Sequence, residues 1–259
     1  MSGRPPVVLV HGMYMNGASW QPWVERGTER GWDVHAPSWP FHEGEPAQLR
    51  EHLDPALGKL TFGAVTDHFK RLIDALPERP LLVGHSIGGL QVQKLLADGY
   101  GAAGVAISPA PPRGVVTLDP TFFRANWPHT NPFAGSKPIA MTHERFHYAF
   151  CNSLSRADSD GLWELYTVPE SRNVPRSTLT SAGAIDFRAD GPPMLIVTGD
   201  QDHLTPVGLV RRNHAAYGRG PRSVELEVVP GRSHVICNEP GWEQVADRAF
   251  GWLEARAGA

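Results

Sequence analysis

The sequence predicts an α/β protein in which helices flank a mostly parallel β-sheet. The first observation is that short apolar runs alternate along the chain with amphipathic segments of helical length. This alternation is typical of βα units wound into a parallel sheet. The second is size, because a chain of 259 residues can bury one substantial core. The third is a single long interval, residues 111–190, that breaks the alternation.

The apolar and amphipathic segments define the expected elements in order. Strands are predicted over residues 7–10, 33–36, 81–84, 105–108, 194–198 and 224–229. Helices are predicted over residues 18–30, 64–76, 87–99, 206–217 and 239–255. Asn238 is the expected N-cap of the last helix, with Pro240 in its first turn, where a missing N–H costs no hydrogen bond.

The interval 111–190 is rich in proline and aromatic residues and is predicted to be a lid or cap insertion with helices of its own. The remaining segments, 1–110 and 191–259, would then form the core domain. We expect about half of the aromatic side chains to form a small second core and the others to face a cleft. Phe146 and Trp163 are the candidates for lining a substrate pocket. The aromatic residues of the interval are Phe122, Phe123, Trp127, Phe133, Phe146, Tyr148, Phe150, Trp163 and Tyr166.

The run Gly84-His85-Ser86-Ile87-Gly88 follows the predicted strand at residues 81–84 and has the pattern G-x-S-x-G. In a nucleophile elbow of this kind, a sharp turn from strand to helix exposes the serine hydroxyl, and small residues two positions to either side make the turn possible. The positive end of the following helix would point at Ser86. A glycine-rich turn with an incidental serine is the structural alternative.

A serine hydroxyl is a weak nucleophile, so this hypothesis requires a histidine base and an acid that orients it. In the chain order serine, acid, histidine, the acid is expected after the strand at 194–198, where both Asp200 and Asp202 stand. We predict Asp202, with Asp200 as the rival. His234 follows the strand at 224–229 and would lie on a loop at the same carboxyl edge of the sheet.

Acyl transfer also needs donors for the negative oxygen of the tetrahedral intermediate. The backbone N–H of Ile87, directly after the serine, is one candidate. The backbone N–H of Met13, in the loop after the first strand, is the second, because Gly12 lets the chain approach closely. His11 is expected to be a buried, hydrogen-bonded residue that shapes this loop.

Together, V-L-V-H-G-M, V-G-H-S-I-G-G, T-G-D-Q-D-H-L-T-P and G-R-S-H resemble the α/β-hydrolase superfamily, and the stretch from His11 to Pro40 is similar to its esterase and hydroxynitrile lyase branch. The resemblance covers nearly the whole chain. It implies an α/β-hydrolase fold and a catalytic triad of Ser86, Asp202 and His234, because the family's acid is the fourth residue of G-x-x-D.

The sequence departs in three respects from subgroups of that superfamily. Residues 38–44 lack the P-G-x-G-x-S turn that many relatives carry after the second strand. The lyases place a lysine beside the catalytic histidine and a hydroxyl residue in the oxyanion loop, where this chain has Val235 and Gly12. Epoxide hydrolases and haloalkane dehalogenases use an aspartate nucleophile, which Ser86 excludes.

A second motif, H-E-x-x-H, spans His143 to His147 and could hold zinc with Glu144 as base. A zinc site needs a third ligand, and neither Glu164 nor Glu170 is singled out by the sequence. We therefore predict no metal or other cofactor and interpret this segment as a lid helix whose Phe146 and Phe150 face inward.

The net charge of −3 and the lack of a basic stripe argue against nucleic acid or an anionic membrane as partner. No signal peptide or membrane-spanning run is visible, and two cysteines are too few for a disulfide framework, so we expect reduced thiols in a cytoplasmic protein. The expected partner is a small-molecule substrate. The oligomeric state stays open.

These observations predict a serine hydrolase that cleaves carboxylic esters or lactones bearing an apolar or aromatic group through an acyl-enzyme. An acyltransferase, a thioesterase or a C–C bond hydrolase would use the same residues and remains an alternative. A ligand receptor that has kept the fold without the reaction is a further alternative.

Overall fold

The computed structural model describes residues 4–257, apart from the side chains of residues 129, 130 and 132, and this part of the chain contains one six-stranded sheet. The strand order is β2-β1-β3-β4-β5-β6, and every neighbouring pair is parallel. The predicted α/β class with a parallel sheet is therefore confirmed. The strands are β1 (Val7–Val10), β2 (Val34–His35), β3 (Leu81–His85), β4 (Ala103–Ile107), β5 (Met194–Gly199) and β6 (Val224–Val229).

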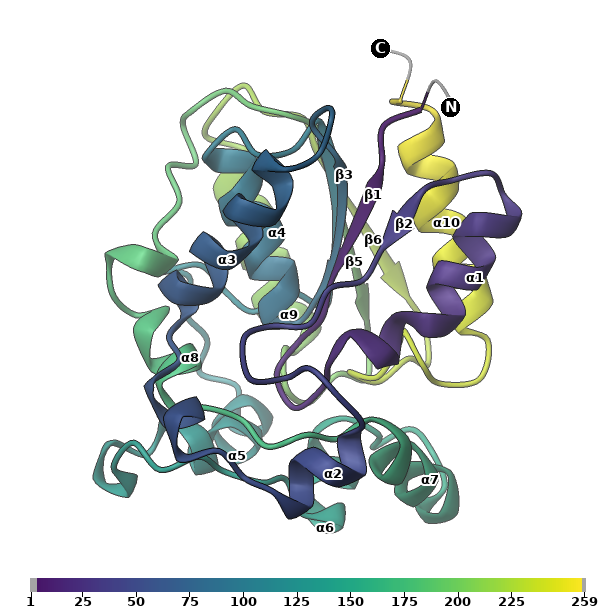
Figure 1. The fold of residues 1–259 in the computed structure, drawn as a ribbon. Helices are drawn as coiled ribbons and strands as arrows, with labels where there is room; N and C mark the ends of the chain where they lie inside the picture. Colours follow the sequence, from purple (N-terminus) through teal and green to yellow (C-terminus); the bar gives the residue numbers. More distant parts are fainter. Residues whose placement is uncertain (1–3, 258–259) are drawn as a thin grey trace.

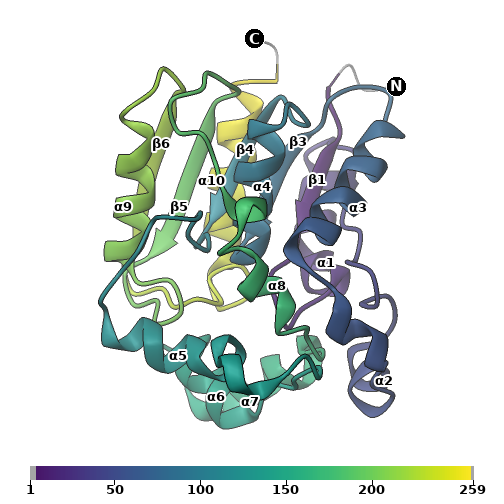
Figure 2. The same cartoon turned by 90° about the vertical axis from the view of Figure 1, so that its left-hand side faces the viewer.

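Helices cover both faces of the sheet, which is why β1, β3, β4 and β5 are buried along their whole length. On one face lie α1 (Gln21–Glu29) and α10 (Trp242–Glu254), whose tryptophans pack with the sheet in one core cluster (Figure 1). On the other face lie α3 (Phe62–Asp74), α4 (Ile87–Ala97) and α9 (Val207–Tyr217), which bury a second cluster (Figure 2). Cys151 and Cys237 are buried free thiols.

Helices α3 and α9 begin at Phe62 and Val207, within two residues of the prediction, and two other helices depart from it in ways that have a structural cause. The segment 18–30 divides into the 3-10 helix η1 (Gly17–Trp20), which Asn16 caps, and α1, because Pro22 has no N–H to continue a single α-helix through this point. The last helix begins at Trp242, after Gly241, and not at Glu239. Gly241 has a φ of 86°, a left-handed conformation that favours glycine, and the predicted cap Asn238 instead donates to the Ser19 carbonyl.

Much of the segment 111–190, between β4 and β5, lies beneath the carboxyl ends of the strands, at the bottom of Figure 1, and its last part rises beside α3 toward the start of β5. Its α-helices are α5 (Pro120–Thr130), α6 (His143–Ala149), α7 (Arg156–Tyr166) and α8 (Asn173–Ser177), and its 3-10 helices are η3 (Pro132–Ala134) and η4 (Ser181–Gly183). Two elements that precede α3 were not predicted, α2 (Pro46–Glu51) and η2 (Pro55–Lys59). Helix α2 lies against α7, where Arg50 donates to the carbonyl oxygens of Glu164 and Thr167.

Within residues 4–257, the structure contains no helix with both the length and the apolar character needed to cross a membrane.

Candidate active site

Ser86 occupies the turn between β3 and α4 with a φ of 59° and a ψ of −121°. A residue other than glycine in this region stores roughly 1–3 kcal/mol of strain. The surrounding backbone holds it there: the Ser86 N–H donates to the Ile107 carbonyl, and the Ser86 carbonyl accepts from the N–H groups of Leu90 and Ala110. The strand-to-helix turn predicted from the G-x-S-x-G run is therefore present, with the serine in a strained conformation.

The two flanking glycines are required by close contacts between backbone segments. A Cβ atom at Gly84 would lie 2.2 Å from the Gly88 oxygen, and one at Gly88 would lie 2.1 Å from the Val10 oxygen. Gly12, in the loop after β1, is equally constrained, since its Cβ would lie 2.9 Å from the Ser86 Cβ. Gly12 and Gly88 therefore allow the loop after β1 to touch the turn at Ser86, and Gly84 allows α4 to approach β3.

We predict that Gly88→Ala lowers the free energy of unfolding by about 3 kcal/mol, because the added methyl group must displace backbone rather than a flexible side chain. Gly251→Ala is the matched control, because Gly251 lies within α10 with no atom near its missing Cβ. That control should stabilise the protein by about 0.5–1 kcal/mol through helix propensity. Urea denaturation of both variants measures the difference, and effects of the same sign would contradict the steric explanation.

Asp202 and His234 form a fully buried pair at the carboxyl edge of the sheet. Nδ1 of His234 lies 2.7 Å from Oδ2 of Asp202. Burial by itself would raise the pKa of the Asp202 carboxyl, but the charge and hydrogen bond of His234, together with hydrogen bonds from Thr205, hold that pKa below its usual value. Asp202 is therefore ionised and fixes the orientation of the ring. Nε2 of His234 is buried and has no hydrogen-bond partner in the described part of the chain.

Asp200, the rival acid, has a different role in the structure. Its Oδ1 accepts a 2.7 Å hydrogen bond from the Gly231 N–H and is also near the Gln201 amide. It joins the loop after β5 to the loop after β6. Of the two aspartates predicted as the acid, Asp202 is the one that contacts His234.

His85 also belongs to this arrangement, although it was not predicted. Its Nε2 donates to the His234 carbonyl at 2.7 Å, and the centroids of the two rings are 4.7 Å apart. Burial and the neighbouring His234 lower the pKa of His85 to about 3, so its ring is neutral and keeps this hydrogen bond. The only sequence signal was its place inside the G-x-S-x-G run, where the family pattern tolerates any residue.

His11 shapes the loop that carries Met13, as the sequence analysis predicts. Its Nδ1 donates to the Gly12 carbonyl at 2.9 Å, and its Nε2 accepts from the Trp39 N–H at 3.0 Å. Burial, reinforced by the nearby His42, lowers the pKa of His11 well below its usual value. Both ring nitrogens of the neutral side chain are therefore engaged within the protein, and neither is free to exchange a proton with a substrate.

Ser86, Met13 and Ile87 line one cavity of about 290 Å³. Thr205, whose hydroxyl donates to Asp202, and Phe150, whose ring is 5.0 Å from that of His234, line it as well. The walls are mostly apolar and come largely from α5, the loop before it, and α8 with the residues after it: Pro111, Pro112, Val115, Val116, Phe122, Phe123, Asn126, Trp127, Pro175, Thr178 and Leu179.

Phe146 and Trp163, predicted to line the substrate pocket, are not part of this cavity wall. Phe146 is fully buried and stacks on Phe150, with 5.0 Å between the ring centroids. Trp163 donates from its indole N–H to the Met141 carbonyl and stacks on His143. Both rings hold the 111–190 segment together, because each points into the packing between helices. Phe122, Phe123 and Trp127 of α5 occupy the cavity wall instead.

The H-E-x-x-H residues do not converge in the structure. Nδ1 of His143 lies 2.8 Å from Asp160, and Nε2 lies 3.6 Å from Glu164. The other proposed ligand, Glu170, is buried beside His42. Among residues 4–257, no three or more His, Cys, Asp or Glu side chains are grouped so that they could hold a metal ion.

The chain is similar to known proteins at three levels: a family model, a protein sequence and several solved structures. A family model described as the alpha/beta hydrolase family matches residues 7–248. The chain is 24% identical over 277 residues to the non-heme chloroperoxidase CPO-A1 of Kitasatospora aureofaciens, covering 95% of this chain and 90% of that protein.

Similar solved structures include a monoacylglycerol lipase of Paleococcus ferrophilus, with a TM-score of 0.70, 20% identity, and coverage of 98% of this chain and 96% of that one. A pyrethroid hydrolase of Sphingobium faniae JZ-2 matches with a TM-score of 0.69, 18% identity, and coverage of 98% and 99%. A polyneuridine aldehyde esterase matches with a TM-score of 0.68, 16% identity, and coverage of 96% and 99%. At identities of 20% or lower, these matches show that the fold is shared.

Proposed function

The chain belongs to the alpha/beta hydrolase family, and from this premise we propose that it is a serine hydrolase of carboxylic esters or lactones that carry an apolar or aromatic group. The observation that carries the proposal is the buried His234–Asp202 pair, in which Nε2 of His234 has no partner in the described part of the chain. Thr205, which contacts both members of the pair, lines the same cavity as Ser86. A histidine oriented by a buried carboxylate and open at its other nitrogen is the arrangement that activates a serine.

In the proposed mechanism, His234 Nε2 takes the proton of the Ser86 hydroxyl as the serine oxygen attacks the carbonyl carbon of the substrate. Asp202 stabilises the imidazolium that forms, and the backbone N–H groups of Met13 and Ile87 bind the negative oxygen. His234 then protonates the departing alcohol, which leaves an acyl-enzyme. Water, deprotonated by the same nitrogen, attacks the acyl carbonyl, and the acid leaves as the serine recovers its proton. The first step needs a hydrogen bond from the Ser86 hydroxyl to Nε2 of His234, which has no partner among the described residues. Catalytic hydrogen bonds are often long in ligand-free enzymes and shorten when substrate binds.

The apolar wall of the cavity supports the substrate class. An apolar acyl or alcohol group that displaces water from this site binds favourably, because apolar surfaces leave water on both sides. The side chains that it would contact are those of Phe122, Phe123, Trp127 and Leu179. The names of the similar structures, a monoacylglycerol lipase, an esterase and a pyrethroid hydrolase, agree with ester cleavage. We further propose that the 111–190 segment acts as a lid over the site, which fits its position across the carboxyl ends of the strands (Figure 2).

A panel of p-nitrophenyl esters of increasing chain length, run beside thioesters, lactones and β-diketones, tests this function. We expect turnover of the oxygen esters or lactones to exceed that of the other classes. A preference for thioesters, for C–C cleavage, or for transfer to an added alcohol over water would assign the same residues to a different reaction. Stoichiometric binding of esters without turnover would instead indicate a receptor.

The cavity wall predicts which aromatic residues set chain-length preference. Trp127→Ala should change the ranking of acyl chains by about tenfold in kcat/KM, because its side chain lines the cavity and is 59% exposed. Phe146→Ala, the control, should lower the free energy of unfolding by about 3–5 kcal/mol and leave the ranking unchanged, because its ring is buried outside the cavity. The two variants are compared by chain-length profile and by melting temperature. If Phe146→Ala changes the ranking of acyl chains and Trp127→Ala does not, Phe146 lines the pocket after all.

A further inference from the structure

A second cavity, of about 390 Å³, lies between α5 and α6 next to the one that Ser86 lines. Tyr14 and Trp127 belong to the walls of both cavities, so the two cavities are neighbours. Tyr14 also directly follows Met13, one of the proposed oxyanion donors. A substrate bound at Ser86 that reaches past Tyr14 or Trp127 would enter this second cavity.

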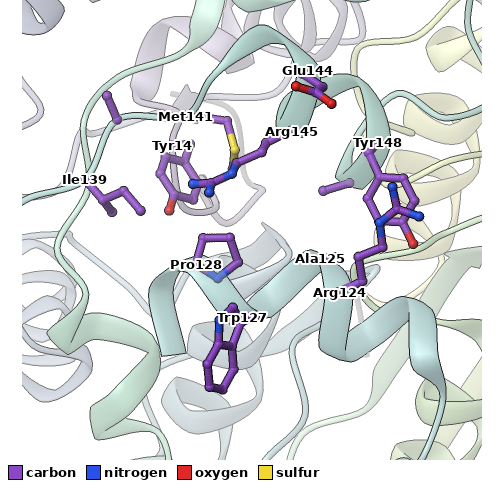
Figure 3. A pocket seen from close by; sticks show the side chains of 12 residues that line it. Tyr14, Arg124, Ala125, Trp127, Pro128, Ile139, Met141, Glu144, Arg145 and Tyr148 are labelled. Carbon is purple, nitrogen blue, oxygen red and sulfur yellow. The ribbon is translucent and has the colours of Figure 1, made fainter. Parts of the chain in front are cut away.

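The walls of the second cavity differ in charge from those of the first. Arg124 of α5 and Arg145 of α6 face it from different sides, with the Arg145 side chain directed toward Tyr14 and the Arg124 guanidinium 4.0 Å from the centre of the Tyr148 ring (Figure 3). Glu144 is the one acidic residue of the wall. In the described part of the chain, neither arginine has a carboxylate within 4.0 Å.

Tyr14 lies between charges of both signs, since its backbone N–H is 3.4 Å from Oε2 of Glu170 and Arg145 shares its cavity wall. Burial and the neighbouring Glu170 raise the pKa of Tyr14, while the charges of Arg172 and Arg145 oppose that rise. Tyr14 therefore remains a neutral phenol, next to two cationic side chains. The rest of the wall is apolar where Ala125, Pro128 and Met141 line it, as Figure 3 shows. A ligand group that fits here is small, negatively charged and attached to an apolar body.

We propose that this second cavity binds a carboxylate of the substrate, on the acyl or the alcohol part, at a distance from the bond that Ser86 cleaves. Guanidinium groups match carboxylates in geometry and can bind them through two parallel hydrogen bonds. The apolar body of the same substrate then occupies the cavity at Ser86. The inference rests on the proposed hydrolase function and narrows its substrate class to half-esters of diacids or to esters of acidic alcohols.

Matched pairs of substrates test this assignment. The first series pairs mono-p-nitrophenyl esters of α,ω-dicarboxylic acids with the corresponding ω-methyl esters, over increasing chain lengths. The second pairs butyrate esters of 4-hydroxybenzoate with those of 4-hydroxybenzamide. We expect at least one series to show a lower KM for the anionic member, a preference that weakens as salt is added.

Variants of the wall residues test which side chains cause the lower KM for the anionic substrate. Arg145→Gln and Arg124→Gln should each raise KM for the anionic member about five- to tenfold, with kcat and the neutral member little changed, because one charged contact to the carboxylate is lost. Glu144→Gln should strengthen the preference. Arg211→Gln, on an exposed face of α9, makes the same charge change away from both cavities and should have no effect. Arg113→Gln, in the wall of the Ser86 cavity, should also leave the preference unchanged.

A binding measurement separates this inference from the proposed function. In Ser86→Ala, which would be inactive, a half-ester of the preferred length should raise the melting temperature, and Arg145→Gln in that background should reduce the shift. Glutarate alone should not reproduce it, because the proposed ligand is a carboxylate carried by an apolar body. Absence of any hydrolysis would overturn the function while leaving this binding test valid. The second site would be rejected if neither series shows a preference for the anionic member. It would also be rejected if Arg113→Gln abolishes that preference, or if the preference persists in both Arg124→Gln and Arg145→Gln.

Discussion

Ser86→Ala is expected to lower kcat for any ester substrate by at least about 10⁴-fold, because it removes the attacking oxygen and leaves the cavity and the oxyanion donors in place. The fold should be unaffected, since alanine occupies the same strained backbone conformation as serine. A serine-directed fluorophosphonate should label the wild type and fail to label this variant. Steady-state kinetics and intact-protein mass spectrometry measure both effects.

Ser86→Gly is the matched control for this prediction. Glycine adopts the φ of 59° without strain, so this variant should gain about 1 kcal/mol in free energy of unfolding while losing as much activity as Ser86→Ala. Stability and activity would thereby be separated at one position. A fluorophosphonate adduct on another serine, or substantial activity in both purified variants, would move the nucleophile elsewhere.

Asp202→Asn is expected to lower kcat by about 10⁴-fold, because an amide cannot stabilise the imidazolium and favours the wrong tautomer of His234. The fold should tolerate the change, since the asparagine oxygen can still accept the hydrogen bonds that Leu204 and Thr205 donate. Asp200→Asn makes the same chemical change two residues away, on a side chain bonded to Gly231, and should alter kcat by no more than about threefold.

The two aspartate variants are compared by kcat, KM and melting temperature on one substrate. Equal losses of activity, or a larger loss in Asp200→Asn, would reject Asp202 as the acid. A loss in Asp202→Asn that parallels a fall in melting temperature would indicate a structural role for the carboxylate and not a catalytic one.

The fold was largely predictable because its signals are local. The apolar run of β6 lies at the predicted residues 224–229, and β3 ends one residue beyond the predicted 81–84, at the turn that Gly84 allows. The boundaries that differ have separate causes. Pro22 acts locally at the start of α1, whereas at the start of α10 a Cβ on Gly241 would lie 2.4 Å from Nη2 of Arg232, in the loop after β6.

The candidate site likewise has a part that local motifs predict and a part that they do not. Ser86, Ile87 and Met13 are identified by motifs of consecutive residues, since the steric demands of an elbow act within a few positions of the chain. The catalytic roles of these residues stay predictions. The aromatic wall could not be chosen from sequence, because Phe122, Phe146 and Trp163 are equally apolar, and the side each presents to the cavity depends on how α5, α6 and α7 pack.

The sequence by itself determined the parallel α/β architecture and the short list of residues able to perform the chemistry, because strand periodicity and turn sterics operate over neighbouring residues. The tertiary structure decided that Asp202 contacts His234 while Asp200 binds Gly231, and that α5 forms much of the wall above Ser86. It also brought Arg124 and Arg145 to a second cavity beside the first. Such pairings join segments far apart along the chain, and only the packing of the whole molecule fixes their distances.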